Sequence, residues 1–146
     1  MRAKKKPPSK AFKAGLAMRK RVLGEDYVER SFKNPDDFSM PFHELSTEFA
    51  WGSVWTRPGL SLRDRSLVSL AQCIALNRPN ELRIHLRGAI RNGVTTTEIR
   101  ELCLHSFPYC GAPASLDAFH IAAAALPEIE ALEKAAKKRP RQEPRF

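Results

Sequence analysis

One stretch of this chain, residues 80–111, constrains the fold more than any other, because it has the pattern of two amphipathic helices joined by a tight turn. Asn80 is a suitable N-cap for the first helix, and Gly93 fits the position after a helix where the backbone turns left-handed. Thr95 and Glu98 have the spacing of a capping box, which predicts that the second helix begins just after Thr95. The stretch therefore predicts two consecutive helices with apolar faces to bury.

Ionisable side chains lie along the edges of these two apolar faces. Glu81 and His85 are four residues apart at the border of the first stripe, and His105 lies on the margin of the second. A carboxylate and two imidazoles beside packed faces are a candidate acid/base cluster, with Arg65 and Tyr109 as possible hydrogen-bond donors. The same spacing also suits a solvated ion pair between Glu81 and His85. On the residue pattern alone, both interpretations stay open.

The rest of the chain also has helical patterns. No segment shows sustained strand alternation, an internal repeat or a GxGxxG phosphate loop, so the sequence predicts an all-α fold, an irregular bundle of about six or seven helices. We expect a basic N-terminal tail over residues 1–10, one domain over 11–133 and a basic C-terminal tail over 134–146. The expected helices cover residues 11–23, 34–52, 61–77, 80–92, 96–107, 114–126 and 127–138, and residues 25–32 are expected to form a short helix or a turn.

One asparagine and several prolines are expected to start, bend or end these helices. Asn34 starts a helix in which Pro41 causes a bend and Phe42, Leu45 and Phe49 point inward. Pro108 is expected to kink or end the second central helix near Phe107. Pro127 is expected to begin a separate final helix, with acids first and lysines last, as the helix dipole prefers.

The segment WGSVWTRPGL holds both tryptophans of the chain. Trp51 and Trp55 flank a turn, where large aromatic residues either cap a core or line a pocket. Ser61 can cap the next helix, which carries Arg63 and Arg65 in its first turns. Arginine is unfavourable there for the helix dipole, so the two arginines either hold an anion or a carboxylate or pair with neighbouring acids.

The net charge of +9 is concentrated at the two ends. Residues 1–21 carry nine Lys and Arg and no acid, whereas residues 22–133 carry ten basic and fifteen acidic residues. Basic tails can bind phosphate groups, but they serve equally as solvated ends, and we predict no nucleic-acid partner. No apolar run reaches 18 residues, so we expect no membrane span, and the N-terminus lacks the apolar core of a secretory signal. Its basic, acid-free character leaves a transit peptide open.

Cysteine and histidine spacing argues against a metal or disulfide framework. Three widely spaced cysteines with no CxxC indicate reduced, structural thiols and a cytoplasmic protein. The four histidines never pair at zinc-like spacing, so we predict no metal ligand. His43 and His120 are single histidines in helical patterns, which favours packing or interface positions over catalysis.

Three segments resemble the carboxymuconolactone decarboxylase/alkylhydroperoxidase D-like family, with a likeness that extends over residues 12–126. They are AGLAMRKRVLGEDYVERS, the run from FAWGSVWTRPGL to GVTTTEIRE, and YCGAPASLDAFHIA. WGSVWTRPGL and AFHIA are closer to the decarboxylase branch than to the redox branch, which depends on a CxxC pair where this chain has ELRIH. The resemblance implies a small all-α enzyme that needs no cofactor.

The activity that the resemblance implies is that of a carboxy-lyase. It would convert 4-carboxymuconolactone to 3-oxoadipate enol-lactone in the protocatechuate branch of aromatic catabolism. His85 is then the expected proton donor, with Glu81 orienting it or sharing the proton. Arg65, or less favourably Arg63, is the expected clamp for a substrate carboxylate.

The remaining expected roles concern the lactone ring and the assembly. His105 and Tyr109 are candidate donors to the lactone oxygen, and Trp51 and Trp55 are candidate apolar walls. The resemblance also implies an obligate homo-oligomer, typically a hexamer. The alternatives are a related enzyme acting on another lactone or small acid and, less favoured, a thiol-dependent peroxidase.

Overall fold

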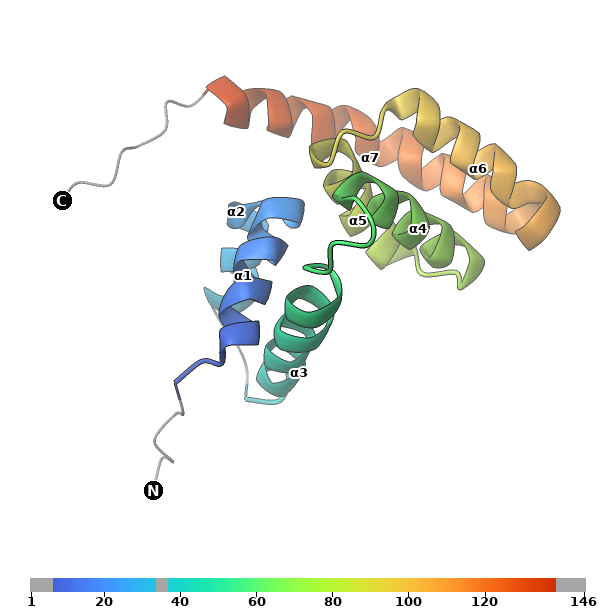
Figure 1. Cartoon of the computed structure of the whole chain (residues 1–146). Coiled ribbons are helices and arrows are strands. Elements are labelled where there is room, and N and C mark those ends of the chain that lie inside the picture. Colours follow the sequence, from blue (N-terminus) through green and yellow to red (C-terminus); the bar gives the residue numbers. More distant parts are fainter. Residues whose placement is uncertain (1–6, 34–36, 139–146) are drawn as a thin grey trace. The chain divides into compact units, whose positions relative to one another are not determined.

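The computed structural model describes residues 7–33 and 37–138 (Figure 1). Within these ranges it contains seven α-helices, one π-helical segment and no β-strand, which confirms the predicted all-α class. The elements are α1 (Lys10–Leu23), α2 (Glu25–Lys33), α3 (Met40–Ser46), η1 (Thr47–Val54), α4 (Leu62–Ala75), α5 (Pro79–Arg91), α6 (Thr96–Cys110) and α7 (Ala112–Lys138). No helix in these ranges has the length and apolar character needed to cross a membrane.

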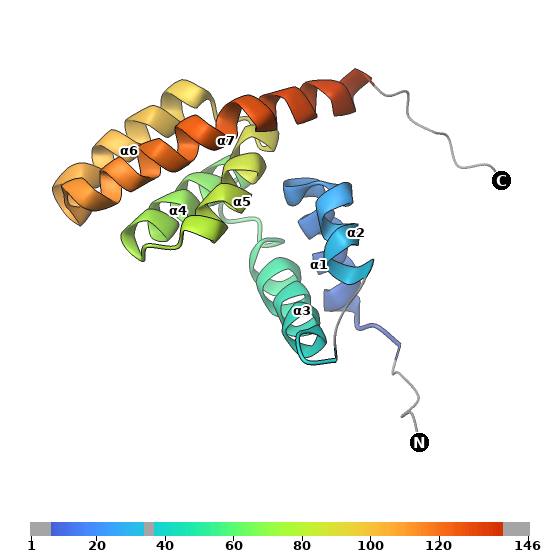
Figure 2. The same cartoon turned by 180° about the vertical axis from the view of Figure 1, so that it is seen from behind.

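The helices form two compact units, residues 1–65 and residues 66–146, with the boundary inside α4. In the first unit α1 packs closely along η1, and Figures 1 and 2 show the two side by side. A Cβ atom at Gly15 would lie 1.9 Å from the carbonyl oxygen of Thr47, and one at Gly52 would lie 2.1 Å from that of Ala11. The two backbones therefore touch, and both positions require glycine.

The start of the third helix differs from the sequence prediction. Asn34, Pro35 and Asp36 lie outside the described residues, Asp37 is in a turn, and α3 begins at Met40. Pro41 lies in the first turn instead of causing a bend, because the missing N–H of proline costs no hydrogen bond there. The helical run then continues as η1 to Val54, so Trp51 lies within a helix and not at a turn.

The prediction that Phe42, Leu45 and Phe49 point inward is wrong. These side chains are 70%, 64% and 64% exposed, and Phe38 is 96% exposed. The buried side of the run carries Thr47 and faces α1, because the two glycines allow close approach only there. The four exposed residues, Phe38, Phe42, Leu45 and Phe49, form what we call the apolar stripe of α3 and η1.

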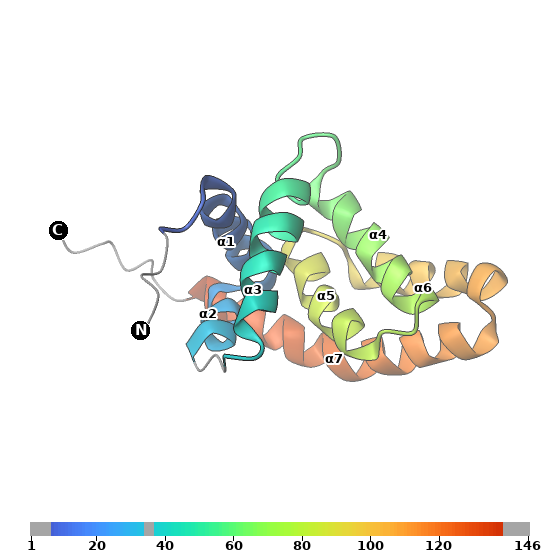
Figure 3. The same ribbon diagram turned by 90° about the horizontal axis from the view of Figure 1, so that it is seen from below.

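The second unit is built around α7, which packs against both α5 and α6 (Figure 3). Alanines on α7 let the neighbouring helices approach, and aliphatic side chains from α4, α5 and α6 fill the space between them. The buried cluster comprises Leu70, Ile74, Leu82, Leu86, Ala89, Val94, Ile99, Cys103, Ala118, Ala122, Ala125 and Ile129. Burial of each of its leucine, isoleucine and valine side chains contributes about 1.5–3 kcal/mol, so this cluster is the main core of the unit.

The capping residues predicted for α4, α5 and α6 are confirmed with one exception. Thr95 and Glu98 form the predicted capping box, and Gly93 has a φ of +90° after the end of α5. Ser61 Oγ accepts a hydrogen bond from the Asp64 N–H at the start of α4. The predicted Asn80 cap is wrong, because α5 begins one residue earlier at Pro79, whose fixed φ suits the first helical turn.

Neither Pro108 nor Pro127 ends or begins a helix. The helix α6 continues through Pro108 to Cys110, and α7 runs without interruption through Pro127. Ala125 and Ile129 are buried on either side of Pro127, so packing of this face stabilises a continuous helix despite the lost backbone hydrogen bond. Consequently α7 extends to Lys138, five residues into the segment expected to be a tail.

Candidate active site

Glu81 and His85 lie one turn apart on α5, and the structure brings them together as the sequence suggested. Glu81 is exposed, whereas the His85 ring is half-buried. Burial lowers the pKa of His85 from its ordinary value, and the Glu81 carboxylate partly opposes that shift. At neutral pH the resting imidazole is therefore uncharged, beside a carboxylate that favours its protonation.

The Cys73 thiol lies within the electrostatic influence of Glu81. Burial raises the pKa of the Cys73 thiol on α4, and the Glu81 carboxylate raises it further. Burial likewise raises the pKa of Cys103, and all three cysteines of the chain are free. Because the thiolate is the nucleophile, these shifts disfavour the peroxidase hypothesis. In the described ranges no three His, Cys, Asp or Glu side chains gather in a group that could hold a metal ion.

A buried hydrogen bond holds the far end of α5 in place. Asn92 Nδ2 donates to Ser66 Oγ at 2.9 Å, and Ser66 is almost completely buried in α4. The bond ties the C-terminal end of the helix that carries His85 to α4. Ser66 was not among the predicted site residues, since a serine inside a helical pattern gives no sign of its partner.

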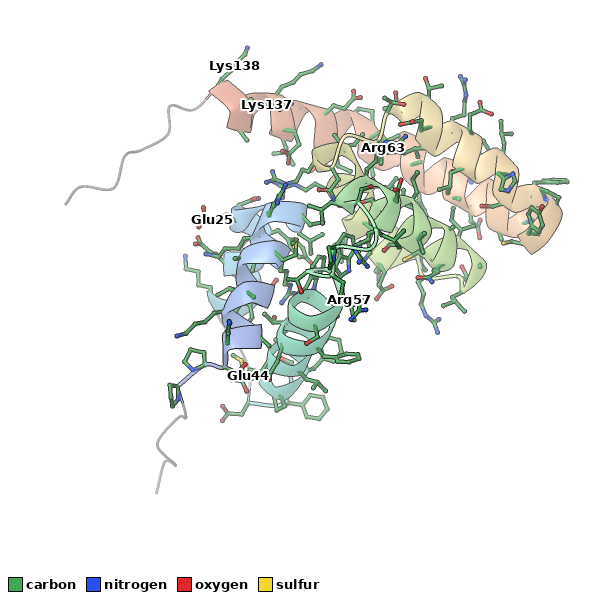
Figure 4. The ribbon with its side chains drawn as sticks, in the orientation of Figure 1. Glu25, Glu44, Arg57, Arg63, Lys137 and Lys138 are labelled. Carbon is green, nitrogen blue, oxygen red and sulfur yellow. The ribbon has the colours of Figure 1, made fainter. Side chains whose placement is uncertain are left out.

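The two candidate clamp arginines have different environments. Arg65 Nη2 donates to the carbonyl oxygen of Arg57 at 2.9 Å, and Arg65 Nε is buried with no hydrogen-bond partner. Arg63 forms an ion pair with Asp64, with 3.6 Å between Nη1 and Oδ1. Figure 4 labels Arg57, in the link after η1, and Arg63, in the first turn of α4. Arg65 thus has one donor without an acceptor among the described residues, whereas the Arg63 charge is partly neutralised.

Trp51 and Trp55 form a stacked pair in the first unit. Their ring centroids are 4.8 Å apart with 26° between the planes, and Trp51 is buried. Trp51 lies within η1 and Trp55 at its C-cap. Single turns of π-helix often occur at functional sites, because they displace a side chain from the regular helical position. The two rings hold each other in a fixed orientation, and their role as apolar walls stays a prediction.

His105 and Tyr109 contact each other on α6, with ring centroids 5.1 Å apart. Both are exposed, and Tyr109 is 77% exposed. Neither makes a hydrogen bond or ion pair with any residue in the described ranges, and no such bond joins them to Glu81 or His85. Their predicted part in the site is therefore not supported by a contact and stays a prediction.

Sequence reasoning missed Arg19, which is only 7% exposed on α1. Its Nη1 donates to Thr47 Oγ1 at 3.2 Å, its guanidinium carbon lies 5.5 Å from the centre of the Phe32 ring, and its Nε is buried without a partner. A signal was present in the sequence, because Arg19 shares a helical face with Gly15 and Val22 at spacings of four and three. The surrounding run of basic residues concealed it.

Two comparisons with known proteins bear on this site. The sequence model of the carboxymuconolactone decarboxylase family matches residues 41–124, which include Glu81 and His85 but not Arg19. The chain is similar to 4-carboxymuconolactone decarboxylase of Acinetobacter baylyi, with 50% identity over 111 residues, 76% of this chain and 83% of the relative. It is also similar to nitrosuccinic acid decarboxylase of Metarhizium robertsii, with 50% identity over 107 residues, 73% of this chain and 75% of the relative.

Proposed function

The chain belongs to the carboxymuconolactone decarboxylase family, and we propose that it converts 4-carboxymuconolactone to 3-oxoadipate enol-lactone and CO₂ without a cofactor. The observation that carries this proposal is the 50% identity with the Acinetobacter baylyi decarboxylase over 76% of the chain. We place the reaction in the protocatechuate branch of aromatic catabolism. The residues described above include side chains of the types that the chemistry requires.

The reaction needs electron delocalisation and one proton. The bond between the ring carbon and the departing carboxylate breaks, and its electron pair moves through the ring double bond onto the lactone carbonyl oxygen. The resulting dienolate then takes one proton at carbon, so the overall reaction consumes one proton and releases CO₂. Because the lactone itself accepts the electron pair, the protein has to stabilise a developing oxyanion and supply an acid.

We assign the acid to His85 and the orienting or proton-sharing role to Glu81. Burial keeps the His85 imidazole neutral at neutral pH, so the ring is not yet an imidazolium acid before substrate binds. A bound substrate with two carboxylates raises the pKa of a neighbouring imidazole, and Glu81 acts in the same direction. Substrate binding would therefore lead to protonation of His85, and the dienolate would later receive that proton.

The other site residues have supporting roles in the proposal. Arg65 is the preferred clamp for a substrate carboxylate, since its Nε lacks a partner, and Arg63 is the second choice. The stacked pair of Trp51 and Trp55 supplies the apolar wall that favours charge dispersal as CO₂ leaves.

His105 and Tyr109 remain candidates for donation to the lactone oxygen. Their exposure on α6 makes them the weakest assignments, because an oxyanion is stabilised best by donors fixed in a site that excludes water.

Nitrosuccinic acid is a second candidate substrate, because the Metarhizium robertsii relative is equally identical. This compound and 4-carboxymuconolactone share two features. Each carries two carboxylates, and each places the departing carboxylate on a carbon whose electron pair can pass to a neighbouring acceptor, a nitro group or an unsaturated lactone. The same acid and the same clamp would serve both reactions.

We also propose a homo-oligomer, with the hexamer as the expected size, in the cytoplasm. The apolar stripe of α3 and η1 supports assembly, because exposed contiguous apolar surface commonly marks an interface. A second exposed apolar group lies where α6 meets α7 and comprises Leu104, Phe107, Tyr109 and Leu116. The three free cysteines support a reducing compartment.

The test is a direct assay with both acids. Purified protein receives 4-carboxymuconolactone or nitrosuccinic acid, and CO₂ and organic product are followed, with and without a chelator. We expect turnover of the lactone, unchanged by the chelator. Faster turnover of nitrosuccinic acid would favour the second candidate, and turnover of neither acid would exclude both.

Variants of the acid test the mechanism. His85→Gln and Glu81→Gln should lower kcat by about 10²- to 10⁴-fold for the proton donor and less for its partner. His120→Gln, a change of an exposed histidine on α7, is the matched control and should leave kcat unchanged. Full turnover by His85→Gln at unchanged stability would remove His85 from the mechanism.

A further inference from the structure

Hydrogen bonds to the two ends of α7 determine where α5 and α6 lie along it. Near the start of α7, Ser115 Oγ donates to the carbonyl oxygen of Cys103 on α6 at 2.8 Å. Near its end, Glu133 accepts from Arg87 and Arg91, in the last turns of α5, at 2.9 and 2.7 Å. Ser115 and Glu133 are about five turns apart on this continuous helix, which corresponds to about 27 Å. The C-terminal parts of α5 and α6 therefore lie near opposite ends of α7.

This arrangement separates two groups of candidate site residues within one subunit. His105 follows Cys103 by two residues, and Tyr109 lies one turn further along α6. His85 precedes Arg87 by two residues on α5. Two residues of helix add only about 3 Å, so the gap between the two histidines remains on the order of 20 Å. One small lactone therefore cannot contact both histidines of the same subunit.

The surface around the ring pair on α6 has the character of an interface. Leu104, Phe107 and Leu116 are 50%, 55% and 55% exposed where α6 meets α7. Asp117, the next residue along α7, is exposed and forms no ion pair with any residue in the described ranges. We call these four residues the α6–α7 face. Exposed contiguous apolar surface commonly marks a site of association.

The surface beside Glu81 and His85 has the complementary charge. Arg78 and Arg83 are exposed, and neither forms an ion pair within the part of the chain that the structure describes. Leu76, in the link between α4 and α5, is 65% exposed. We call Leu76, Arg78 and Arg83 the α4–α5 edge. An apolar side chain beside two arginines matches an apolar face that carries a carboxylate.

We propose that the α6–α7 face of one copy docks on the α4–α5 edge of a second copy, where His105 and Tyr109 complete the site. This inference rests on the function proposed above. Docking excludes water from the ring pair, and the imidazole and the phenol hydroxyl each donate to the lactone oxyanion. Asp117 then faces the partner's Arg78 and Arg83. Each site combines the acid of one subunit with the donors of another, so an isolated subunit has no complete site.

Mixed oligomers of two impaired variants test for a site shared between subunits. His85→Gln removes the acid, and the double variant His105→Ala, Tyr109→Phe removes the donors. Each should lower kcat by about 10²-fold or more. Co-expression with two different affinity tags, followed by purification on both, isolates the mixed oligomers. About a quarter to a half of their sites would combine the intact half of each variant, so kcat should recover to that fraction of the wild-type value.

The control combines two changes in the same half of the site. Mixed oligomers of His85→Gln with Glu81→Gln should not exceed the mean activity of their parents, and His120→Gln, an exposed change on α7, should leave kcat unchanged. Full activity of the double variant would overturn the donor role. Loss of activity without recovery in the mixed oligomers, or full activity of a monomeric wild type, would overturn the shared site.

Photo-cross-linking tests the contact without turnover. Oligomers that combine ¹⁵N-labelled and unlabelled copies carry p-benzoylphenylalanine in place of Tyr109 and are irradiated. Mass spectrometry should find peptides that join a labelled to an unlabelled chain and contain residues from 76–91. Cross-links confined to one chain or to other surfaces would overturn the proposal. The expected cross-link in a protein that does not act on the lactone contradicts the proposed reaction only, whereas an active enzyme without cross-link or recovery contradicts this inference only.

Discussion

The two units of the molecule differ in whether a buried charged side chain is paired with an opposite charge. In the second unit the nearly buried Glu133 on α7 accepts from Arg87 Nε at 2.9 Å and from Arg91 Nη1 at 2.7 Å, so its charge is fully paired inside the chain. In the first unit the equally buried Arg19 contacts the neutral hydroxyl of Thr47 and the Phe32 ring, with no carboxylate partner among the described residues. A paired buried charge is explained by the fold, whereas an unpaired one calls for something that the chain itself does not supply.

Apolar surface shows the same contrast. The second unit buries a contiguous cluster of aliphatic residues from four helices. The first unit is held mainly by the close backbone contact of α1 with η1 and leaves Phe38, Phe42, Leu45 and Phe49 exposed. The second unit thus has a contiguous apolar core, although Leu104, Phe107 and Leu116 remain exposed on it, whereas the first unit relies on one backbone contact and leaves an apolar stripe open.

The largest expected effect comes from the backbone contact of the first unit. Gly15→Ala should lower the free energy of unfolding by more than about 3 kcal/mol, because its Cβ would lie 1.9 Å from a backbone oxygen and the helices would have to separate. Urea denaturation measures the loss. Gly59→Ala is the matched control, since nothing lies within 4 Å of a Cβ there, and it should stay within about 0.5 kcal/mol of the wild type.

The paired charge of the second unit should come next. Glu133→Gln leaves Arg87 and Arg91 without their carboxylate, and the free energy of unfolding should fall by about 3 kcal/mol, the lower end for breaking a buried pair because Arg91 is partly exposed. The activity of the folded fraction should not change. Glu128→Gln, at an exposed position of the same helix, is the control, and equal stability of the two variants would contradict the comparison.

The contrast between the units also marks what the sequence could predict. Local chemistry predicted the capping box at Thr95, the turn at Gly93 and the all-α class, because each depends on a few adjacent residues. The helices continue through Pro108 and Pro127, because burial of a helix face outweighs the loss of one hydrogen bond. The inward orientation of Phe42 failed because the sequence does not show that two glycines pull α1 onto the opposite face.

The candidate site likewise contains some contacts that the sequence could predict and others that it could not. The pairing of Glu81 with His85 follows from helical spacing, so the sequence could predict it. The isolation of Arg19 and the bond from Asn92 to Ser66 depend on contacts between elements far apart in the chain. Contacts between residues far apart in the chain produce no recognisable pattern in the local sequence. The family likeness indicates the chemistry but does not identify the residues that make these contacts.

A charge introduced on the apolar stripe of α3 and η1 should weaken assembly of the oligomer. The effect on the stability of each subunit should be smaller. Phe42→Asp places a charge on a surface that we expect to be covered by another copy, and burial of a phenylalanine contributes about 2 kcal/mol. Light scattering after size exclusion should show a smaller species at micromolar concentration. Leu60→Asp, an exposed apolar position outside the stripe, should leave the assembly intact, and a monomeric wild type would contradict the expectation.

The smallest expected effect concerns the pH dependence of stability in the second unit. The folded pKa of His85 lies below its ordinary value of about 6.5, so above about pH 7 the ring is neutral in both states. As the pH falls through that value, the unfolded chain binds a proton before the folded one does, and the free energy of unfolding decreases. Urea titrations from about pH 7.5 to 5.5 should show a weaker decrease for His85→Gln than for the wild type, while His120→Gln keeps the wild-type slope.

Replacement of Glu81 should change the pH dependence of stability in the direction opposite to replacement of His85. Its carboxylate raises the pKa of His85 against the effect of burial, so Glu81→Gln should move the folded pKa further from the unfolded one. Stability should then decrease more steeply with falling pH than in the wild type, the reverse of the result for His85→Gln. Parallel slopes in all three proteins would mean that His85 titrates in the folded protein as it does in the unfolded chain, and the argument for an uncharged resting acid would be lost.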